Sequence, residues 1–243
     1  MDNRGPRVIA HRGASAQAPE NTMAAMEKAA DLGAAWVEFD VKLSRDGHPV
    51  VMHDDTLRRT CGAPGAVADL TLAELSAFRA GAWFGPAFAD EPIPTLEGLV
   101  ALLERRGLGA NVELKPCPGR DTETGQVVGA FLRDRWPASL PVPVVSSFSD
   151  ESLAACRAVA PDLPRALLVE AIPGDWADRM AALGCVDLHA RWRELTAEQV
   201  RRVRGAGHAL RCYTVNDPQA ARRLFDWGVD AVISDAPDRM PNG

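Results

Sequence analysis

Residues 7–43 read RVIAHRGASAQAPENTMAAMEKAADLGAAWVEFDVKL and contain one complete unit of strand, helix and strand. The stretch opens with a β-branched apolar run, which predicts a strand. The helical pattern that follows has Asn21 or Thr22 as its cap and ends at Gly33. A second apolar run at 35–43 predicts another strand. Two strands joined by a helix indicate a parallel sheet.

The same alternation continues to the end of the chain. Strands are predicted at 7–10, 35–43, 110–114, 142–146, 166–169, 186–189, 209–214 and 231–234. Helical patterns include those at 150–159, 175–183, 196–206 and 218–227. About eight strands alternating with helices are what a closed barrel of this type uses, so the predicted fold is a TIM (β/α)8 barrel of the α/β class.

One segment interrupts the alternation, at about 55–95, between the second and third predicted barrel strands. It is rich in Gly and Pro and has only a short helical stretch near 72–78. Long irregular connections often have a functional role, so we interpret it as a small inserted subdomain that could cap the active-site mouth. The length of 243 residues suits one barrel of roughly 250 residues, and we predict a single domain over 1–243.

The charge balance bears on the partners. The formal net charge of -6 is unfavourable for a nucleic-acid partner, because phosphate backbones attract a surplus of Lys and Arg. Arg201, Arg202 and Arg204 form a local basic cluster on a predicted helix that also carries Glu198. Such a mixture is more typical of a solvated helix face than of a binding patch.

The sequence also indicates the compartment. No apolar stretch approaches the ~20 residues of a membrane span, and we expect no signal peptide, because the N-terminus leads straight into the first strand. The scattered cysteines form no CxxC pair, which fits the reducing cytoplasm; they are Cys61, Cys117, Cys156, Cys185 and Cys212. The oligomeric state is left open, with a homodimer as one alternative.

Acidic side chains occur at a spacing that suits a metal site. Side chains two residues apart project from the same side of a strand, so Glu38 and Asp40 point into one space. Glu113 and Lys115 have the same spacing on another strand. If both strands direct these faces to the barrel mouth, the three acids offer the oxygen ligands that a hard divalent cation prefers. Lys115 would lie beside them as a cation for an anionic substrate.

Two histidines follow apolar runs, where barrel enzymes place catalytic groups. His11 follows the first strand and His53 follows the apolar run at 49–52. Because the pKa of histidine lies near neutrality, one ring can accept a proton while the other donates one. Arg12 can bind a phosphate through two hydrogen bonds, and Gly13 would let the backbone approach it closely.

Two other side chains are candidates for the pocket wall. Phe148 follows a predicted strand and could form an apolar wall, although buried packing explains it equally well. His189 ends a predicted strand, where it either lines the pocket or has a structural role in the core.

Five short motifs contain most of the candidate residues and occur in one order along the chain. They are His11-Arg12-Gly13, Pro19-Glu20-Asn21-Thr22, Val37-Glu38-Phe39-Asp40-Val41, His53-Asp54-Asp55-Thr56-Leu57 and Val112-Glu113-Leu114-Lys115-Pro116. Their order and spacing resemble the glycerophosphodiester phosphodiesterase family, and within it the small cytoplasmic bacterial enzymes associated with glycerol-phosphate uptake. The likeness covers nearly the whole chain.

The resemblance implies a metal-dependent hydrolase that converts glycerophosphodiesters to sn-glycerol 3-phosphate and an alcohol. It implies one divalent cation, Mg2+ or Ca2+ with Mn2+ also open. The implied roles are metal ligands for Glu38, Asp40 and Glu113, an acid/base pair for His11 and His53, and phosphate contacts for Arg12 and Lys115.

Departures from the family pattern concern the substrate rather than the chemistry. Tyr213 stands where many relatives have Trp, so the resemblance implies a place in the pocket for this ring. Ala16 and Gln17 stand where many relatives have Gly and Tyr. Both departures concern packing around the alcohol, and the preferred alcohol is left open.

Other functions and routes remain as alternatives. One is a phospholipase D-like lyase that stops at a cyclic phosphate, with sphingomyelin or a lysophospholipid as substrate. Another is a catalytically silent barrel that only binds glycerol phosphate. Hydrolysis itself can pass through a cyclic glycerol phosphate or through direct attack by metal-bound water, and the sequence does not separate these routes.

Overall fold

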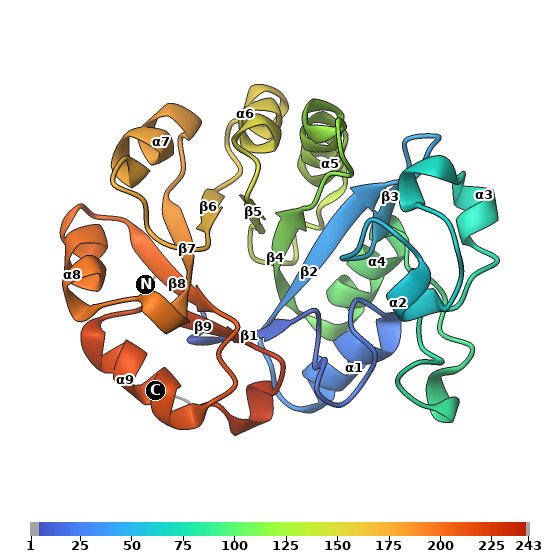
Figure 1. Ribbon diagram of the computed structural model, residues 1–243, viewed down its shortest axis with the longest axis horizontal. Coiled ribbons are helices and arrows are strands. Elements are labelled where there is room, and N and C mark those ends of the chain that lie inside the picture. Colours follow the sequence, from blue (N-terminus) through green and yellow to red (C-terminus); the bar gives the residue numbers. More distant parts are fainter. Residues whose placement is uncertain (1–4, 242–243) are drawn as a thin grey trace.

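A closed ring of parallel strands forms the centre of the molecule in the computed structural model, which describes residues 5–241 (Figure 1). Its strands are β1 (Val8–His11), β2 (Trp36–Leu43), β4 (Gly109–Leu114), β5 (Val144–Ser147), β6 (Arg165–Val169), β7 (Asp187–Arg191), β8 (Ala209–Tyr213) and β9 (Ala231–Ser234). Parallel pairing of β1 with both β2 and β9 closes the ring. The predicted TIM barrel is confirmed, and each strand lies within two residues of its predicted bounds.

Helices surround the strand ring (Figure 1). They are α1 (Met23–Asp31), α4 (Leu96–Arg106), α5 (Asp121–Arg135), α6 (Asp150–Val159), α7 (Trp176–Leu183), α8 (Ala197–Gly205) and α9 (Pro218–Trp227). The cap of α1 is Thr22, whose side chain accepts a hydrogen bond from the backbone N–H of Ala25. Gly125 lies inside α5, where a Cβ atom would come within 2.2 Å of the Ser152 carbonyl, so glycine lets α5 and α6 pack closely.

The segment between the second and third barrel strands departs from the alternation. It contains β3 (Pro49–Val51), which pairs antiparallel with β2, and then α2 (Arg58–Cys61), η1 (Val67–Asp69), α3 (Leu72–Leu75) and η2 (Pro86–Phe88). The sequence predicts one helical stretch near 72–78, whereas the structure has further single turns. Elements of three or four residues are too short for a periodicity to reveal them. The division into a single domain with an insertion stays a prediction.

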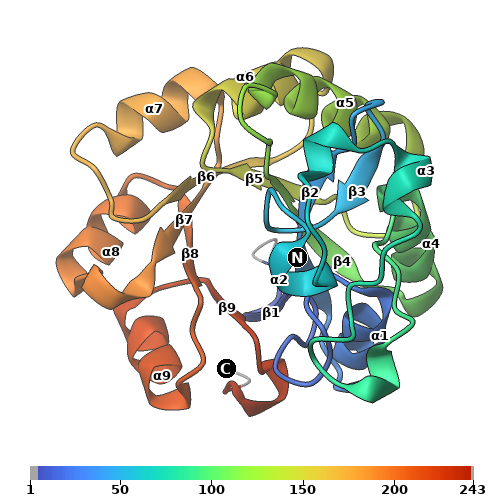
Figure 2. The same cartoon turned by 45° about the vertical axis from the view of Figure 1, so that its right-hand side comes forward.

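The inserted segment has an apolar core of its own. Leu57, Val67, Leu75 and Ile93 are buried together there. In Figure 2, α2 and the loops around it lie over one side of the strand ring. Within residues 5–241, no helix is both long enough and apolar enough to cross a bilayer.

The inside of the barrel is unusually polar. Asp187, His189 and Arg211 are buried on neighbouring strands, and the Asp187 carboxylate lies 2.6 Å from Arg211 Nε and 3.3 Å from His189 Nε2. Asn111 and Ser146 are buried on β4 and β5. Because inward-facing residues alternate along each strand, these side chains have the same facing as the acidic residues nearer the strand ends.

Candidate active site

The acidic cluster forms where β2 and β4 run side by side. The register pairs Asp40 with Glu113 and Glu38 with Asn111, so the predicted acids face the same interior space. One carboxylate oxygen from each of Glu38, Asp40 and Glu113 lies within 4.8 Å of the others. All three residues are buried, which is costly for charged groups unless cations compensate them.

Two cationic side chains lie against this cluster. Arg12 Nε lies 3.3 Å from Asp40 Oδ2, and Lys115 Nζ lies 2.8 Å from Glu113 Oε1 and 3.7 Å from Asp40 Oδ1. Arg12 has a left-handed backbone with φ of 53°, and its N–H donates to Glu38 Oε2 at 3.0 Å. The structure therefore brings together the five side chains that the sequence analysis assigned to the metal and the phosphate.

The surroundings shift the pKa values of the three acids in different directions. Burial acts to raise the pKa of Asp40, but Arg12, His53 and Lys115 outweigh it and hold this pKa at about 2. Burial and the charge of Asp40 raise the pKa of Glu113 to about 7. Burial, with the charges of Asp40 and Glu113, also raises the pKa of Glu38 well above its usual value. In the absence of further positive charge, Glu38 and Glu113 hold protons more tightly than ordinary carboxylates, whereas Asp40 holds its proton less tightly.

Two carboxylate oxygens in the cluster lack a hydrogen-bond partner. Glu38 Oε1 and Asp40 Oδ1 are buried, and no donor among residues 5–241 reaches them. Buried polar atoms are almost always satisfied, so these two unpartnered oxygens favour the binding of a further positively charged group beside them. A divalent cation with oxygen ligands fits this donor set.

His11 lies on one side of the cluster. Its Nδ1 is 2.6 Å from Asp235 Oδ1, and its Nε2 is 3.9 Å from Glu38 Oε2. Asp235 also accepts hydrogen bonds from Ser15 Oγ at 2.9 Å and Asn216 Nδ2 at 2.6 Å. Burial acts to raise the pKa of Asp235, but the hydrogen bond with His11 and the other contacts bring it to about 2. The resulting carboxylate orients the imidazole so that Nε2 faces the acids.

His53 lies near Asp40, in a similar arrangement. Its Nδ1 is 2.7 Å from Asp54 Oδ1. Arg59 on α2 donates to both oxygens of Asp54, at 2.7 and 2.8 Å, and these hydrogen bonds hold the pKa of Asp54 well below its usual value. Burial lowers the pKa of His53, which favours the neutral ring.

Arg59 also connects the inserted segment to the phosphate-binding candidate. It donates to both oxygens of Glu20, at 2.6 and 2.8 Å, and Glu20 Oε1 in turn accepts from Arg12 Nη1 at 2.8 Å. A continuous series of charged contacts therefore runs from His53 through Asp54, Arg59 and Glu20 to Arg12.

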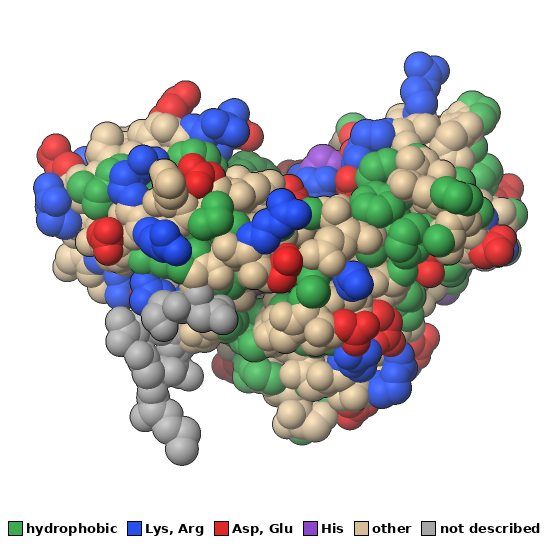
Figure 3. All heavy atoms as spheres, turned by 90° about the horizontal axis from the view of Figure 1, so that it is seen from below, with side chains coloured by type: hydrophobic (Ala, Val, Ile, Leu, Met, Phe, Trp, Pro, Cys, Tyr) green, Lys and Arg blue, Asp and Glu red, His purple; other side chains and the backbone are tan. Residues whose placement is uncertain are grey.

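A cavity of about 230 Å3 opens over the cluster. Its lining includes both histidines, Glu38, Glu113, Arg12 and Lys115. Phe148, Leu168, Glu170, Tyr213 and Thr214 complete most of the wall. The rings of Phe148 and Tyr213 pack edge to face with centroids 6.0 Å apart, and Tyr213 Oη donates to the Val169 carbonyl. A wider cavity of about 510 Å3 adjoins it past His53 and Lys115. Figure 3 shows a histidine side chain in the hollow at the upper edge of the molecule, beside acidic and basic side chains.

His189 and Gly13 were also candidates from the sequence, and the structure shows what each of them contacts. His189 is fully buried beside Asp187 and is not among the residues that line the cavity, so of its two expected roles the geometry fits the structural one. A Cβ atom on Gly13 would come within 2.6 Å of the Ala25 carbonyl group. Glycine at this position, with φ of 81°, therefore allows the turn to pack on α1, and its close approach to a phosphate stays a prediction.

Comparison with known proteins decides the family. Residues 11–239 match the model of the glycerophosphoryl diester phosphodiesterase family. The chain belongs to this family. A glycerophosphodiester phosphodiesterase of Caldanaerobacter subterraneus is 35% identical over 97% of this chain and 96% of its own length. One from Bacillus subtilis is 34% identical over 95% of this chain and 84% of its own length.

A solved structure supports the same assignment. The Oleispira antarctica phosphodiesterase, in complex with its product sn-glycerol-3-phosphate, has a TM-score of 0.94 and 41% identity to this chain, over 97% of this chain and 95% of the other. The family resemblance and the barrel expected from the sequence are therefore both confirmed.

Several supporting residues of this phosphodiesterase have roles in the site that the sequence did not reveal. Asn21 donates to Asp40 Oδ2 at 2.8 Å and accepts from the Asp40 backbone N–H at 3.2 Å, so it positions a member of the acidic cluster rather than capping α1. Asp235 and Arg59 orient the two histidines. Asn21 belongs to one of the five motifs, but sequence patterns do not pair residues that only the closed barrel and the inserted segment bring together.

Proposed function

We propose that the acidic cluster of this phosphodiesterase binds one divalent cation and that His11 and His53 transfer the protons of glycerophosphodiester hydrolysis. The observation that carries this proposal is the trio of buried acids, two of them with unpartnered oxygens, between two imidazoles that are each anchored by a carboxylate. Each ring presents Nε2 to the site, because its Nδ1 is engaged.

Glu38, Asp40 and Glu113 would hold the cation. Their oxygen ligands favour Mg2+, Ca2+ or Mn2+ over softer metals. When bound, the cation would polarise a phosphoryl oxygen. Its positive charge would also favour the ionised forms of Glu38 and Glu113, whose pKa values are raised without it.

The imidazoles would act as base and acid. One takes a proton from the attacking group, either water or the glycerol hydroxyl beside the ester, and the other donates a proton to the departing alkoxide. In the glycerol route a cyclic phosphate forms, and water then opens it to sn-glycerol 3-phosphate. Arg12 and Lys115 would bind the phosphoryl oxygens and stabilise the charge that develops on them. Both cations already lie within 4 Å of the cluster, so a phosphate bound there meets them without a large movement.

The cavity dimensions suit this substrate. The space of about 230 Å3 beside the acids would take the glycerol phosphate half, with Phe148 and Tyr213 as an apolar wall. The adjoining space of about 510 Å3, which shares His53 and Lys115 with the first, would take the alcohol. The product in the Oleispira antarctica complex, sn-glycerol-3-phosphate, supports the same choice. A cytoplasmic location is part of the proposal, and the five free cysteines support it.

Phosphorus NMR of the reaction products tests the proposal. With glycerophosphocholine and added Mg2+, Ca2+ or Mn2+, we expect sn-glycerol 3-phosphate as the final phosphorus species and loss of turnover after chelation. A cyclic phosphate that accumulates as the final product, from this substrate, a lysophospholipid or sphingomyelin, would identify a lyase instead. An absence of turnover with every glycerophosphodiester and cation would leave only a binding barrel.

A further inference from the structure

A third cavity lies at the opposite end of the barrel from the acidic cluster. Its volume is about 500 Å3, and it is lined by Gly5, Arg7, Arg201, Arg204, Phe225, Trp227, Gly228, Val229 and Asp230. These residues come from the segment before β1, from α8, and from the end of α9 with the turn before β9. Strand beginnings and helix ends meet at the amino-terminal face of a β/α barrel, whereas the catalytic groups lie at the carboxyl-terminal face.

The lining carries uncompensated positive charge. It contains three guanidinium groups and one carboxylate. Arg204 Nη1 lies 2.7 Å from Asp230 Oδ2, which leaves Arg7 and Arg201 without a carboxylate within 4.0 Å in the part of the chain that the structure describes. By contrast, many arginines elsewhere pair with a carboxylate at 3.1 Å or less, among them Arg45, Arg59, Arg120, Arg135, Arg179 and Arg191. The whole chain has a net charge of -6, whereas the charged side chains that line this cavity are mostly positive.

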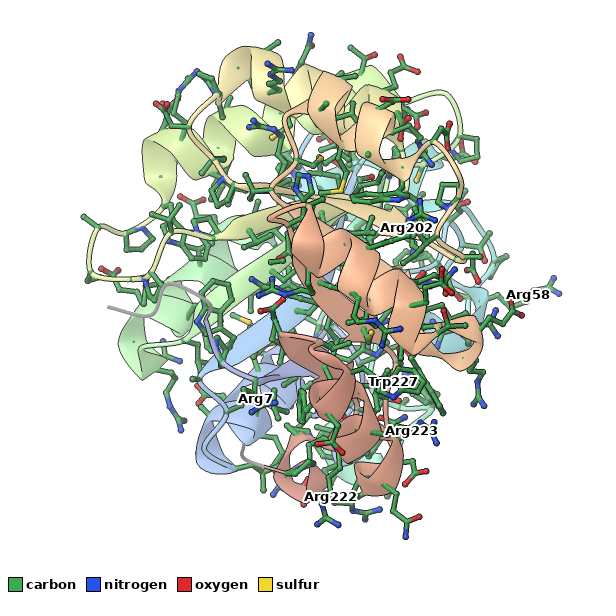
Figure 4. All side chains as sticks on the ribbon, turned by 90° about the vertical axis from the view of Figure 1, so that its left-hand side faces the viewer. Arg7, Arg58, Arg202, Arg222, Arg223 and Trp227 are labelled. Carbon is green, nitrogen blue, oxygen red and sulfur yellow. The ribbon has the colours of Figure 1, made fainter. Side chains whose placement is uncertain are left out.

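The surroundings add to the positive field. Figure 4 shows Arg202 on α8 and Arg222, Arg223 and Trp227 on α9, with Arg7 to the left of these two helices. No carboxylate lies within 4.0 Å of Arg202, Arg222 or Arg223 among residues 5–241. The basic cluster that the sequence analysis interpreted as a solvated helix face therefore contributes two of its members, Arg201 and Arg204, to a cavity wall.

Parts of the lining are held in place before any ligand binds. The guanidinium carbon of Arg7 lies 4.0 Å from the centre of the Phe225 ring, so the ring supports one flat face and leaves the N–H edges for an acceptor. Arg204 also donates to the His208 carbonyl at 2.8 Å. Preorganised cations lose less conformational entropy when they bind an anion.

We propose that this cavity binds a small phosphate-bearing molecule, with the phosphate on Arg7 and Arg201 and a planar group against Trp227. Arginine edges match phosphate oxygens through paired, charge-assisted hydrogen bonds. A volume of about 500 Å3 is in the range of small-molecule sites. The Trp227 indole lines it as an aromatic surface, with the Arg223 guanidinium carbon 5.6 Å from the ring centre. A nucleoside monophosphate has this combination of phosphate and planar ring, and inorganic phosphate shares the anionic part alone.

Calorimetric titration of AMP, inorganic phosphate and adenosine into the metal-loaded protein tests the proposal. The double substitution Arg7→Gln with Arg201→Gln should weaken AMP binding at least about tenfold, because charge-assisted hydrogen bonds are lost. The matched control, Arg58→Gln with Arg193→Gln, removes two arginines outside the cavity and should leave AMP binding unchanged. Lys115→Met weakens the catalytic phosphate site and should retain AMP binding. Unchanged hydrolysis and thermal unfolding would show that the first variant is folded.

Comparison of the three ligands shows whether the site binds a nucleotide or the free phosphate anion. Tighter binding of AMP than of inorganic phosphate, with the difference removed by Trp227→Ala, supports a ligand with a planar group. Equal affinities of AMP and phosphate support a site for the free anion. The proposal is overturned if AMP does not bind, if adenosine binds as tightly as AMP, if Lys115→Met abolishes binding, or if the cavity and control variants weaken it equally.

Discussion

His11 and His53 place Nδ1 against a carboxylate at nearly the same distance, 2.6 and 2.7 Å, but different parts of the chain hold the two carboxylates. Asp235 directly follows β9, which pairs with β1, the strand that ends at His11. Asp54 belongs to the connection after β3, and Arg59 on α2 fixes its orientation. The first pair is therefore built by the barrel and the second by ion pairs of the inserted segment.

The barrel and the inserted segment should respond differently to single substitutions. Strand register is set by a ladder of backbone hydrogen bonds and by buried side chains, so a single surface substitution leaves it intact. Arg59 is 43% exposed, and its contacts with Glu20 and Asp54 can be broken one at a time. We therefore expect substitutions in the inserted segment to affect His53, and Arg12 through Glu20, but not His11, whose position depends on the closure of the barrel.

The largest effect should follow the loss of either imidazole. His11→Ala and His53→Ala should each lower kcat by about 10²- to 10⁴-fold, because general acid or base catalysis is lost. Steady-state assays with glycerophosphocholine measure the effect, and circular dichroism checks the fold. A near-normal rate in either variant would contradict the assigned proton transfers.

A smaller loss should follow the neutralisation of Asp235. Asp235→Asn should lower kcat roughly 10- to 100-fold with little change in KM, because a carboxamide no longer stabilises a protonated His11. The pH profile of kcat separates this effect from a structural one. An unshifted profile with an unchanged rate would mean that the contact at 2.6 Å does not orient the ring for catalysis.

Substitution of Arg59 tests whether His53 and His11 are held by separate parts of the chain. Arg59→Met should lower kcat about three- to tenfold, because Asp54 is then less firmly positioned. In NMR spectra of the histidine rings, the His53 signals should shift while those of His11 stay in place. Arg58→Met is the matched control, since Arg58 lies on the same helix without a carboxylate partner among residues 5–241. Equal shifts of both histidines would refute the separation of the two sides.

The smallest predicted effect is a pH dependence of stability, which arises from the acidic cluster. The pKa of Glu113 is raised to about 7, so the folded protein retains a proton that the unfolded chain releases. Without metal, the thermal unfolding temperature should therefore fall as pH rises from about 5 to 8. In Glu113→Gln this part of the pH dependence should be absent. A metal-free protein that gains stability over this range through Glu113 would contradict the sign.

Local patterns in the sequence predicted the elements well. Runs of β-branched residues gave the barrel strands, and the two-residue spacing of Glu38 and Asp40 gave their common facing, which the register with β4 confirms. Long-range pairings were not predictable. Asp235 is 224 positions from His11 and approaches it only because β9 closes the ring. Arg59 lies on a helix of four residues, too short to be recognised from periodicity.

Titration with Mn2+, with the free ion followed by electron paramagnetic resonance, tests the metal site most directly. The wild-type protein should bind one ion per chain with an affinity that glycerol phosphate does not abolish. Asp40→Asn and Glu113→Gln should weaken binding by at least about 100-fold, since loss of an outer partner alone costs about 10- to 100-fold. His11→Ala should bind the ion normally. Wild-type affinity in both acid variants, or full hydrolysis by the chelated enzyme, would contradict the account.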